Sequence, residues 1–360
     1  MRLVQPLTAT SGQPHPRRRI PRTPPLALLA AVSLAIAACT PGGGGSPAGS
    51  PGDGGGGEAA AYPDSPITFI VPFSEGGPTD TVTRLIADPM ATELGGEIVV
   101  QNVEGAGGTV AAEQVANAEA DGYTVLMHHI GMSTAPTLYP DLAYDPLEDF
   151  EMIGLVTEVP MTIIGSPNFE PNTLEELLAY VEENIDTVTY ANAGVGAASQ
   201  LCGLLIESAT GLDLTEVPYE GTGPAMEDLL GDQVDFMCDQ TTNTAERILG
   251  EEVKAYAVTT PERIAALPEV PTTVEEGLEE VQVTVWHGLY APAGTPQEIL
   301  DELNAALVAA LADEEVITRL GELGTAPVAE DRATPDAHRE QLESQIELWR
   351  PIIEEAGVTA

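Results

Sequence analysis

The chain has 360 residues, and its 57 Asp and Glu outnumber its 13 Lys and Arg, which gives a formal net charge of −44 at pH 7. This excess of negative charge excludes nucleic acid as a partner, because nucleic-acid binding depends on basic side chains that neutralise phosphates. The long-range field also repels anionic ligands, so any anion site must depend on local backbone dipoles.

The first 38 residues have the composition of an export signal. Three consecutive arginines precede an apolar run over residues 26–38, which is shorter than the about 20 residues that a membrane-spanning helix needs. The tetrapeptide that ends at Cys39 resembles a bacterial lipobox, in which the cysteine is lipidated and becomes the first residue. The alternative is an ordinary signal cut near Ala38 with an incidental cysteine. Because the leader holds five basic residues and no acidic residue, the remaining chain has a net charge of −49.

A stretch rich in Gly, Pro and Ser follows, and residues 39–61 are predicted to form a flexible tether. A tether makes physical sense when its start is fixed, and several acyl chains hold a protein on a bilayer far better than one. The sequence therefore predicts an exported protein with a signal peptide at residues 1–38. It would be attached at Cys39, by lipid alone, to the outer face of the cytoplasmic membrane.

From Ile67 onward, short β-rich apolar runs alternate with turns and with stretches that have apolar residues at helical spacing. Strands are predicted at Ile67 to Pro72, Ile98 to Asn102, Thr124 to Met127, Met161 to Gly165, Thr187 to Ala191, Thr215 to Pro218, Val234 to Met237, Ala255 to Val258 and Thr284 to Tyr290. Helices are predicted at Thr79 to Leu94, Gly108 to Ala118, Leu174 to Asn184, Ala197 to Thr210, Pro224 to Leu230, Pro296 to Ala312 and Pro335 to Ala356.

This alternation predicts an α/β fold. Residues 165–283 form their own series of strands and helices before the chain returns to a strand, so two lobes are predicted. The first lobe comprises residues 62–164 and 284–360, and the second comprises residues 165–283. The chain would cross between them twice, and such a protein closes on a ligand by hinge motion.

Three strand-to-helix turns are candidates for the ligand site, because ligands of open α/β sheets bind beyond the carboxyl ends of the strands. The first turn covers residues 71–80. Its consecutive glycines let backbone N–H groups approach a ligand, and a helix start favours carboxylates by roughly 0.3 to 1 kcal/mol at exposed sites. The alternative is that Asp80 is a plain capping residue.

The second turn covers residues 190–199 and the third covers residues 217–225, where Tyr219 and Thr222 can donate hydrogen bonds. Two facing sets of amides suit a dicarboxylate. The second turn distantly resembles a dinucleotide fingerprint, but its third glycine is missing and no phosphate-binding Lys-Thr or Lys-Ser pair is present. We therefore expect neither nucleotide binding nor any other cofactor.

Three histidines, His128, His129 and His287, are predicted near the cleft. They do not stand at metal-ligand spacing, so we expect no metal and interpret His129 and His287 as ligand contacts. Ser74 and Ser199 lack the turn of a hydrolase nucleophile, and no motif places a carboxylate pair for acid–base catalysis. We expect no enzymatic activity.

Cys202 and Cys238 are the remaining cysteines besides Cys39. An exported protein meets an oxidising environment, so we predict one disulfide between them, with two buried free thiols as the alternative. The closed loop of about 36 residues would contribute roughly 3 to 4 kcal/mol of stability in the chain-entropy model.

Five further segments occur together with these three turns, in an order found in one family: residues 102–108, 121–124, 144–146, 268–272 and 291–296. Over nearly all of residues 62–358, the chain resembles the tripartite tricarboxylate transporter substrate-binding proteins, also called Bug receptors. The resemblance implies a two-lobed periplasmic binding protein of the venus-flytrap, type II fold. It also implies that a monomer holds a small organic acid through backbone amides and waters, and hands it to the large and small subunits of a membrane permease.

The ligand-binding residues are expected on both sides of the cleft. By position, the resemblance implies Ser74, Gly76, Gly77 and Asp80 on one side and Asn192, Ala193, Gly194, Ser199, Thr222 and Asp239 on the other. The turn patterns add Gly196, Tyr219 and Gly221. His129 is added because it lies at the end of a strand. Glu75 and Thr79 depart from the family pattern, and the carboxylate of Glu75 at the mouth acts against a fully anionic ligand.

The sequence thus predicts an extracytoplasmic receptor that captures a small carboxylated metabolite by lobe closure. The ligand class is a di- or tricarboxylate or a related organic acid, and delivery is expected to a tripartite tricarboxylate-type permease. One alternative keeps the binding but signals to a membrane sensor kinase, and a more remote one is an extracellular hydrolase. The identity of the ligand is not predicted, because main-chain recognition leaves few side chains to interpret.

Overall fold

The computed structural model describes residues 62–360, and the predicted signal, Cys39 and the tether lie outside these residues. The strands are β1 (Ile67–Val71), β2 (Ile98–Asn102), β3 (Thr124–His129), β4 (Phe150–Gly165), β5 (Thr189–Asn192), β6 (Thr215–Pro218), β7 (Phe236–Gln240), β8 (Lys254–Val258) and β9 (Thr284–Pro292). The helices are α1 (Pro78–Leu94), the short 3-10 turn η1 (Ala106–Gly108), α2 (Thr109–Ala116), α3 (Gly131–Leu138), α4 (Leu174–Glu183), α5 (Ala198–Thr210), α6 (Thr222–Leu230), α7 (Thr241–Leu249), α8 (Gln297–Leu311), α9 (Glu314–Glu322) and α10 (Pro335–Ala356).

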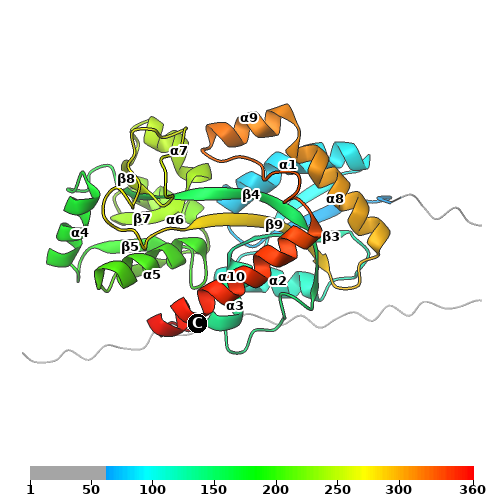
Figure 1. Ribbon diagram of the computed structural model, residues 1–360, viewed down its shortest axis with the longest axis horizontal. Coiled ribbons are helices and arrows are strands. Elements are labelled where there is room, and N and C mark those ends of the chain that lie inside the picture. The colour runs from blue at the N-terminus through cyan, green and yellow to red at the C-terminus, as the bar shows by residue number, and fades with distance from the viewer. Residues whose placement is uncertain (1–61) are drawn as a thin grey trace, which may run out of the picture. The chain divides into compact units, whose positions relative to one another are not determined.

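Strand β4 joins two halves of the sheet. Within residues 62–360 the strand order is β2-β1-β3-β9-β4-β7-β5-β6, with β8 also paired to β4. Residues 150–160 of β4 pair with β9, whereas residues 161–165 pair with β7 and β8. We call β1, β2, β3, β9 and residues 150–160, with their helices, the first half, and residues 161–165 with β5 to β8 and their helices the second half. Figure 1 shows β4 and β9 side by side through the middle of the fold, between these halves.

Both halves repeat one βαβαβ arrangement. Strand β1 lies between β2 and β3, and β5 lies between β6 and β7, with parallel pairing in all four cases. In each half the chain starts at the central strand, passes through a helix to the outer strand, and returns through a second helix to the inner strand. The carboxyl ends of parallel strands meet at one edge, so the turns after β1, β2 and β3 lie together, as do those after β5, β6 and β7.

The apolar cores lie on the two faces of the sheet. Alternate residues of a strand point to opposite faces, and accordingly Val125 and Met127 of β3 belong to one cluster and Leu126 to another. The first cluster also holds residues of α1, α8 and α9. The second holds residues of α2, α3 and α10 and continues into α4 and α5. The two halves therefore share a core on the face that α10 covers, where this helix runs diagonally in the view of Figure 1.

The elements predicted from sequence are present, but the structure adds others. Strand β4 begins at Phe150 rather than at Met161, and α3, α7 and α9 were not among the predicted helices. Strand β7 ends at Gln240, three residues beyond its predicted end. The predicted lobe limits at residues 164 and 283 stay a prediction, although the pairing of β4 changes close by, between Pro160 and Met161.

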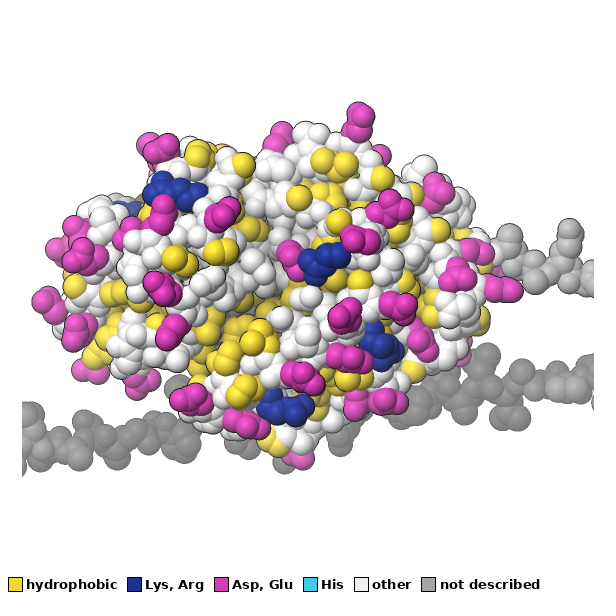
Figure 2. Space-filling view, in the orientation of Figure 1, with side chains coloured by type: hydrophobic (Ala, Val, Ile, Leu, Met, Phe, Trp, Pro, Cys, Tyr) yellow, Lys and Arg dark blue, Asp and Glu magenta, His cyan; other side chains and the backbone are white. Residues whose placement is uncertain are grey.

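The surface carries the negative charge that the composition requires. Figure 2 shows acidic side chains spread over the visible face of the described chain, with few basic side chains among them. Among residues 62–360, no helix is both long and apolar enough to cross a bilayer.

Candidate ligand-binding site

The turn between β1 and α1 is held by the carboxylate of Asp80. Its Oδ2 accepts hydrogen bonds from the backbone N–H of Gly76 (2.9 Å) and from Nε of Arg84 (2.8 Å), and Oδ1 accepts one from Nδ2 of Asn102 (3.1 Å). Burial acts to raise the pKa of Asp80, but hydrogen bonds from Arg84, Gly76 and Asn102 outweigh burial and lower the pKa. Asp80 therefore positions the turn, and its direct contact with a ligand stays a prediction.

Glu75 in the same turn faces solvent. Its side chain is 79% exposed, and its Oε1 lies 3.5 Å from Nη2 of Arg84. Glu75, Asp80 and Arg84 line an open hollow that shares no residue with the cavity described below. The carboxylate that departs from the family pattern thus sits beside a cation on the outside and does not line the cavity.

The turn between β5 and α5 satisfies its own backbone amides. Three side chains accept from them: Oγ of Ser199 from Ala193 (2.9 Å), Oδ1 of Asn192 from Gly194 (2.9 Å) and Oε1 of Gln200 from Gly196 (3.4 Å). Gly194 and Gly196 have φ angles of 89° and 84°, the left-handed region that favours glycine. Nδ2 of Asn192 is buried without a hydrogen-bond partner. The donors that this turn leaves for a ligand include the hydroxyl of Ser199 and the first amides of α5.

The turn after β6 packs directly against the turn after β1. A Cβ built on Gly221 would lie 2.1 Å from Oγ and 2.9 Å from the backbone N of Ser74. A Cβ on Gly223, two residues later, would lie 3.4 Å from Oγ of Ser74 and 3.6 Å from the backbone N of Gly77. Oγ of Ser74 is buried without a hydrogen-bond partner. The two halves thus touch along their backbones here and enclose the hydroxyl of Ser74.

Tyr139, which follows α3, makes a second contact between the halves. Its Oη lies 2.8 Å from the carbonyl oxygen of Ala106 in the first half and 2.7 Å from that of Val195 in the second. Next to it, a Cβ on Gly107 would lie only 2.0 Å from the carbonyl oxygen of Val195. Because no side chain fits between these backbones, the glycine is required for the halves to meet as they do.

A small cavity lies between the two halves, beside these contacts. The first half contributes Phe73, Pro78, Thr79 and His129, and the second contributes Ala193, Ala197, Ala198, Ser199, Thr222 and Gln240. The cavity leaves about 20 Å³ for the centre of a water-sized sphere, which is room for about one water molecule. A small carboxylic acid is larger, so it can enter only when the walls move apart.

Four helices begin at this cavity. They are α1 at Pro78, α5 at Ala198, α6 at Thr222 and α7 at Thr241, directly after Gln240. The first amide N–H groups of a helix have no partner within the helix, and the aligned peptide dipoles add partial positive charge there. Each helix start stabilises a nearby anion by roughly 0.3 to 1 kcal/mol, and by up to about 2 kcal/mol in partly buried geometries. The site therefore supplies the local dipoles that an anion needs in a chain of strongly negative charge.

Buried imidazoles border the cavity on the side of the first half. The ring of His129 stacks on Phe73 with centroids 4.7 Å apart, and Nε2 of His287 lies 3.3 Å from Oγ1 of Thr79. Nδ1 of His129 accepts the backbone N–H of Gly131 (2.9 Å), so its neutral ring carries the proton on Nε2. Burial lowers the pKa of His129 well below its usual value and that of His287 to about 3. Within residues 62–360, no group of three or more His, Cys, Asp or Glu is placed to hold a metal.

Asp239 lies in β7 next to the cavity residue Gln240, and it is 1% exposed. Oδ1 accepts the backbone N–H of Gln240 (2.8 Å) and Oδ2 accepts Nδ2 of Asn243 (2.6 Å). Burial raises the pKa of Asp239 to about 6, although these hydrogen bonds act to lower it. The carboxyl group therefore changes charge near neutral pH, close to where an anion would bind.

Replacing Asp239 by asparagine is expected to change how stability depends on pH. The folded state gives up this proton at a higher pH than the unfolded state, so it loses stability as the pH rises through about 6. The full loss corresponds to about 3 kcal/mol, of which about 2 kcal/mol fall between pH 4.5 and pH 8. In urea unfolding, the free energy of unfolding of Asp239→Asn minus that of the wild type should increase by about 2 kcal/mol from pH 4.5 to pH 8. The exposed Glu227→Gln is the control, and parallel pH profiles for Asp239→Asn and wild type would contradict the assignment.

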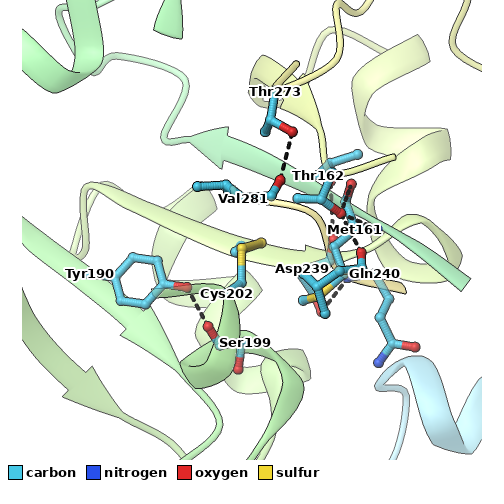
Figure 3. Close-up of a disulfide and its surroundings, with 12 residues drawn as sticks. Met161, Thr162, Tyr190, Ser199, Cys202, Asp239, Gln240, Thr273 and Val281 are labelled. Atoms are coloured by element: carbon cyan, nitrogen blue, oxygen red, sulfur yellow. Dashed lines mark hydrogen bonds between the residues drawn. A yellow bond between two sulfur atoms is a disulfide. The ribbon is translucent and has the colours of Figure 1, made fainter. Parts of the chain in front are cut away.

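A disulfide joins Cys202 in α5 to Cys238 in β7, with Cα atoms 6.2 Å apart, which confirms the predicted pairing. Figure 3 shows this bond beside the hydrogen bond from the hydroxyl of Tyr190, in β5, to the carbonyl oxygen of Ser199. Both contacts hold the beginning of α5, which lines the cavity. The second half therefore presents this helix start on a covalently fixed support.

The structure places the predicted ligand-binding residues in three groups. The cavity wall includes His129, Ala193, Ser199 and Thr222. The contact between the halves includes Ser74, Gly77, Gly194, Gly196 and Gly221. The third group packs within one half and comprises Gly76, Asp80, Asn192, Tyr219, whose hydroxyl donates to Oδ2 of Asp228 (2.7 Å), and Asp239. Contact of each residue with a ligand stays a prediction.

The cavity wall also includes residues that the sequence did not single out as ligand contacts. They are Phe73, Pro78, Thr79, Ala197, Ala198 and Gln240. Gln240 was missed because β7 was predicted to end at Met237. The repeated topology is a signal that could have found it, since Gln240 ends β7 as His129 ends β3.

A two-part α/β fold with a cavity between its parts, at the ends of parallel strands, defines a solute receptor of the periplasmic-binding-protein class. Residues 82–358 match the family described as tripartite tricarboxylate transporter family receptor, and the chain belongs to this family. The membership confirms the predicted resemblance and fold class. It also excludes the hydrolase alternative, because the family consists of solute-binding receptors and not of enzymes.

Similar proteins cover almost all of the described chain. A curated relative from Agrobacterium vitis, the UPF0065 protein in the TAR-I ttuE-ttuC' intergenic region, is 50% identical over 82% of this chain and 86% of its own length. Among solved structures, the periplasmic binding protein BugD is 48% identical with a TM-score of 0.81, covering 83% of this chain and 99% of its own. MatC from Rhodopseudomonas palustris, solved with bound malate, is 41% identical with a TM-score of 0.79, and the match covers 81% of this chain and 100% of MatC.

Proposed function

We propose that this chain is an extracytoplasmic receptor that captures a small carboxylated metabolite between its two halves. It then delivers the ligand to a tripartite tricarboxylate-type membrane permease. The observation that carries the proposal is the convergence of the N-termini of α1, α5, α6 and α7 on one small cavity. Both halves contribute helix N-termini, so closure of the halves should stabilise a bound ligand most when it has two carboxylates.

The short reach of these dipoles fits the charge of the chain. The negative surface slows the approach of an anion, whereas a helix start acts within about one turn of its end. Selection for anions therefore depends on the enclosed cavity and not on attraction from a distance. The malate bound by MatC, a relative of the same fold, supports a dicarboxylate of similar size as the ligand class.

Attachment to the membrane is part of the proposal. Lipidation at Cys39, the 39–61 tether and removal of residues 1–38 would hold the receptor as a monomer on the outer face of the cytoplasmic membrane, within reach of a permease. Uptake of a labelled ligand by cells that lack this chain tests the delivery step. Loss of uptake supports delivery, whereas normal uptake with loss of a transcriptional response favours a sensor kinase as partner.

Thermal unfolding against a carboxylate library tests the binding itself. The chain with Cys39→Ser is unfolded and refolded with its disulfide intact, to remove any carried-over ligand. A ligand at 100 times its Kd stabilises the folded state by about 2.7 kcal/mol, which raises the Tm by roughly 4 °C for about 300 residues. We expect this shift for a group of di- or tricarboxylates. A shift for neutral or cationic solutes and for no carboxylate would contradict the proposal.

A further inference from the structure

Gln240 occupies an unusual place in the cavity wall. It ends β7 and directly precedes the first residue of α7, and its side chain is buried, with 4% exposure. Figure 3 shows the side chain extending away from β7 toward the ribbon of the first half. It therefore belongs to the second half but reaches the region where the halves meet, opposite Thr79 and His129.

The other polar groups at the cavity supply donors. Oγ of Ser199 already accepts the amide of Ala193, so its own proton is free to be donated. His129 has its proton on Nε2, because Nδ1 accepts from Gly131. The four helix starts add amide N–H groups. Carboxylate oxygens are pure acceptors and satisfy donors of this kind.

Oε1 of Gln240 has the opposite requirement. It is a buried acceptor without a hydrogen-bond partner within residues 62–360. A carboxylate cannot satisfy it, and a buried polar group that stays unpaired is costly. With the amide in this orientation, the ligand that completes the site brings a hydrogen-bond donor in addition to its carboxylates.

We propose that Gln240 is a specificity-determining residue whose Oε1 accepts a hydrogen bond from a hydroxyl or ammonium group on the ligand. The preferred ligands are then dicarboxylates that carry such a donor on the carbon next to a carboxylate, and not plain dicarboxylates. This inference rests on the proposed function and sharpens its ligand class. In an enclosed site, a ligand that makes this hydrogen bond is expected to bind about five- to a hundredfold more tightly than a ligand that leaves Oε1 unpaired.

Calorimetric titration with three four-carbon acids tests the proposal. L-malate carries a hydroxyl, L-aspartate carries an ammonium group, and succinate carries neither. We expect the wild type to bind at least one of the two substituted acids about fivefold or more tightly than succinate. Whichever of the two binds more tightly identifies the donor that Gln240 accepts.

The variant Gln240→Met keeps the length of the side chain and removes the acceptor. It should lose the preference, with the malate-to-succinate or aspartate-to-succinate affinity ratio falling to about one, while succinate binds as well as before. Gln240→Glu keeps an acceptor and should retain the preference, with weaker binding of all three acids because of charge repulsion. Gln233→Met makes the same chemical change at an exposed position and should behave as the wild type.

Two results would overturn the inference while leaving the receptor function intact. The first is a wild type that binds succinate as tightly as both substituted acids. The second is a Gln240→Met variant that keeps the wild-type ratio. If instead neither these acids nor any other carboxylate of the library binds, the proposed function fails, and the inference fails with it.

Discussion

Replacing Gly221 by alanine is expected to weaken ligand binding by about tenfold or more without unfolding the protein. The φ angle of Gly221 is 171°, extended backbone that any residue adopts, so the second half should fold normally. The added Cβ would instead lie 2.1 Å from Oγ of Ser74 in the first half and block the closed arrangement. Overpacking of this kind costs about 1–3 kcal/mol, which corresponds to roughly five- to 150-fold in affinity.

Gly223→Ala is the matched control for this experiment. It adds the same methyl group two residues later, where the nearest atoms, the carbonyl oxygen of Glu75 and Oγ of Ser74, would lie 3.4 Å away. Calorimetric titration of both variants should show a large loss for Gly221→Ala and near-normal affinity for Gly223→Ala. Equal affinities for the two variants would mean that the contact between Gly221 and Ser74 is not part of the ligand-bound state.

Removal of the disulfide is expected to produce the largest loss of stability. The bond closes a loop with a sequence separation of 36 residues, and both cysteines are fully buried. The chain-entropy model gives about 4 kcal/mol for a loop of this length, which lowers the Tm by roughly 6 °C for about 300 residues. Urea unfolding of the double variant Cys202→Ala with Cys238→Ala should show this loss.

The same variant separates stability from binding. The disulfide ties the start of α5 to β7, so its loss should also weaken ligand binding when the protein is still folded. Wild-type protein reduced with a thiol is the second arm of the experiment, because it keeps both sulfur atoms and creates no cavity. A double variant as stable as the wild type would contradict a structural role for the bond.

The sequence predicted most of the framework because the two halves use regular alternation. Short β-rich runs separated by Gly-rich turns located all nine strands of residues 62–360, within a few residues at most ends. The three missed helices have a physical explanation. The sequence of α7, which begins with Thr241-Thr242-Asn243-Thr244, is rich in polar residues, α3 contains Pro136, and α9 buries only Val316 and Leu320. None shows a long apolar stripe at helical spacing.

The first part of β4 was missed for a related reason. The burial of residues 150–160 is nearly continuous, because this part of β4 is packed on both faces of the sheet. Such a strand lacks the alternation of apolar and polar residues that marks a half-exposed strand. Its role as the joint between the halves depends on pairing with strands that are distant in sequence, β9 on one side and β7 and β8 on the other.

The structure brings the three predicted turns together, but the donors that remain free differ from those expected. The Gly-rich turns do meet, yet the amides of Ala193, Gly194 and Gly196 are taken by side chains of their own turn. Glycine patterns predict where backbones approach closely, and they do not show which N–H groups remain free. Gln240 was missed because the predicted strand stops at Met237, although its place at the end of β7 repeats that of His129 at the end of β3.

The central claim is that a carboxylate binds between the halves at the four helix starts. A crystal structure of the chain with the carboxylate that gives the largest Tm shift tests this claim most directly. We predict carboxylate oxygens within about 2.7–3.2 Å of first-turn amides of helices from both halves, among them α1 and α5. A ligand held by one half alone, or on the outer surface away from Thr79, Ser199 and Thr222, would contradict the account.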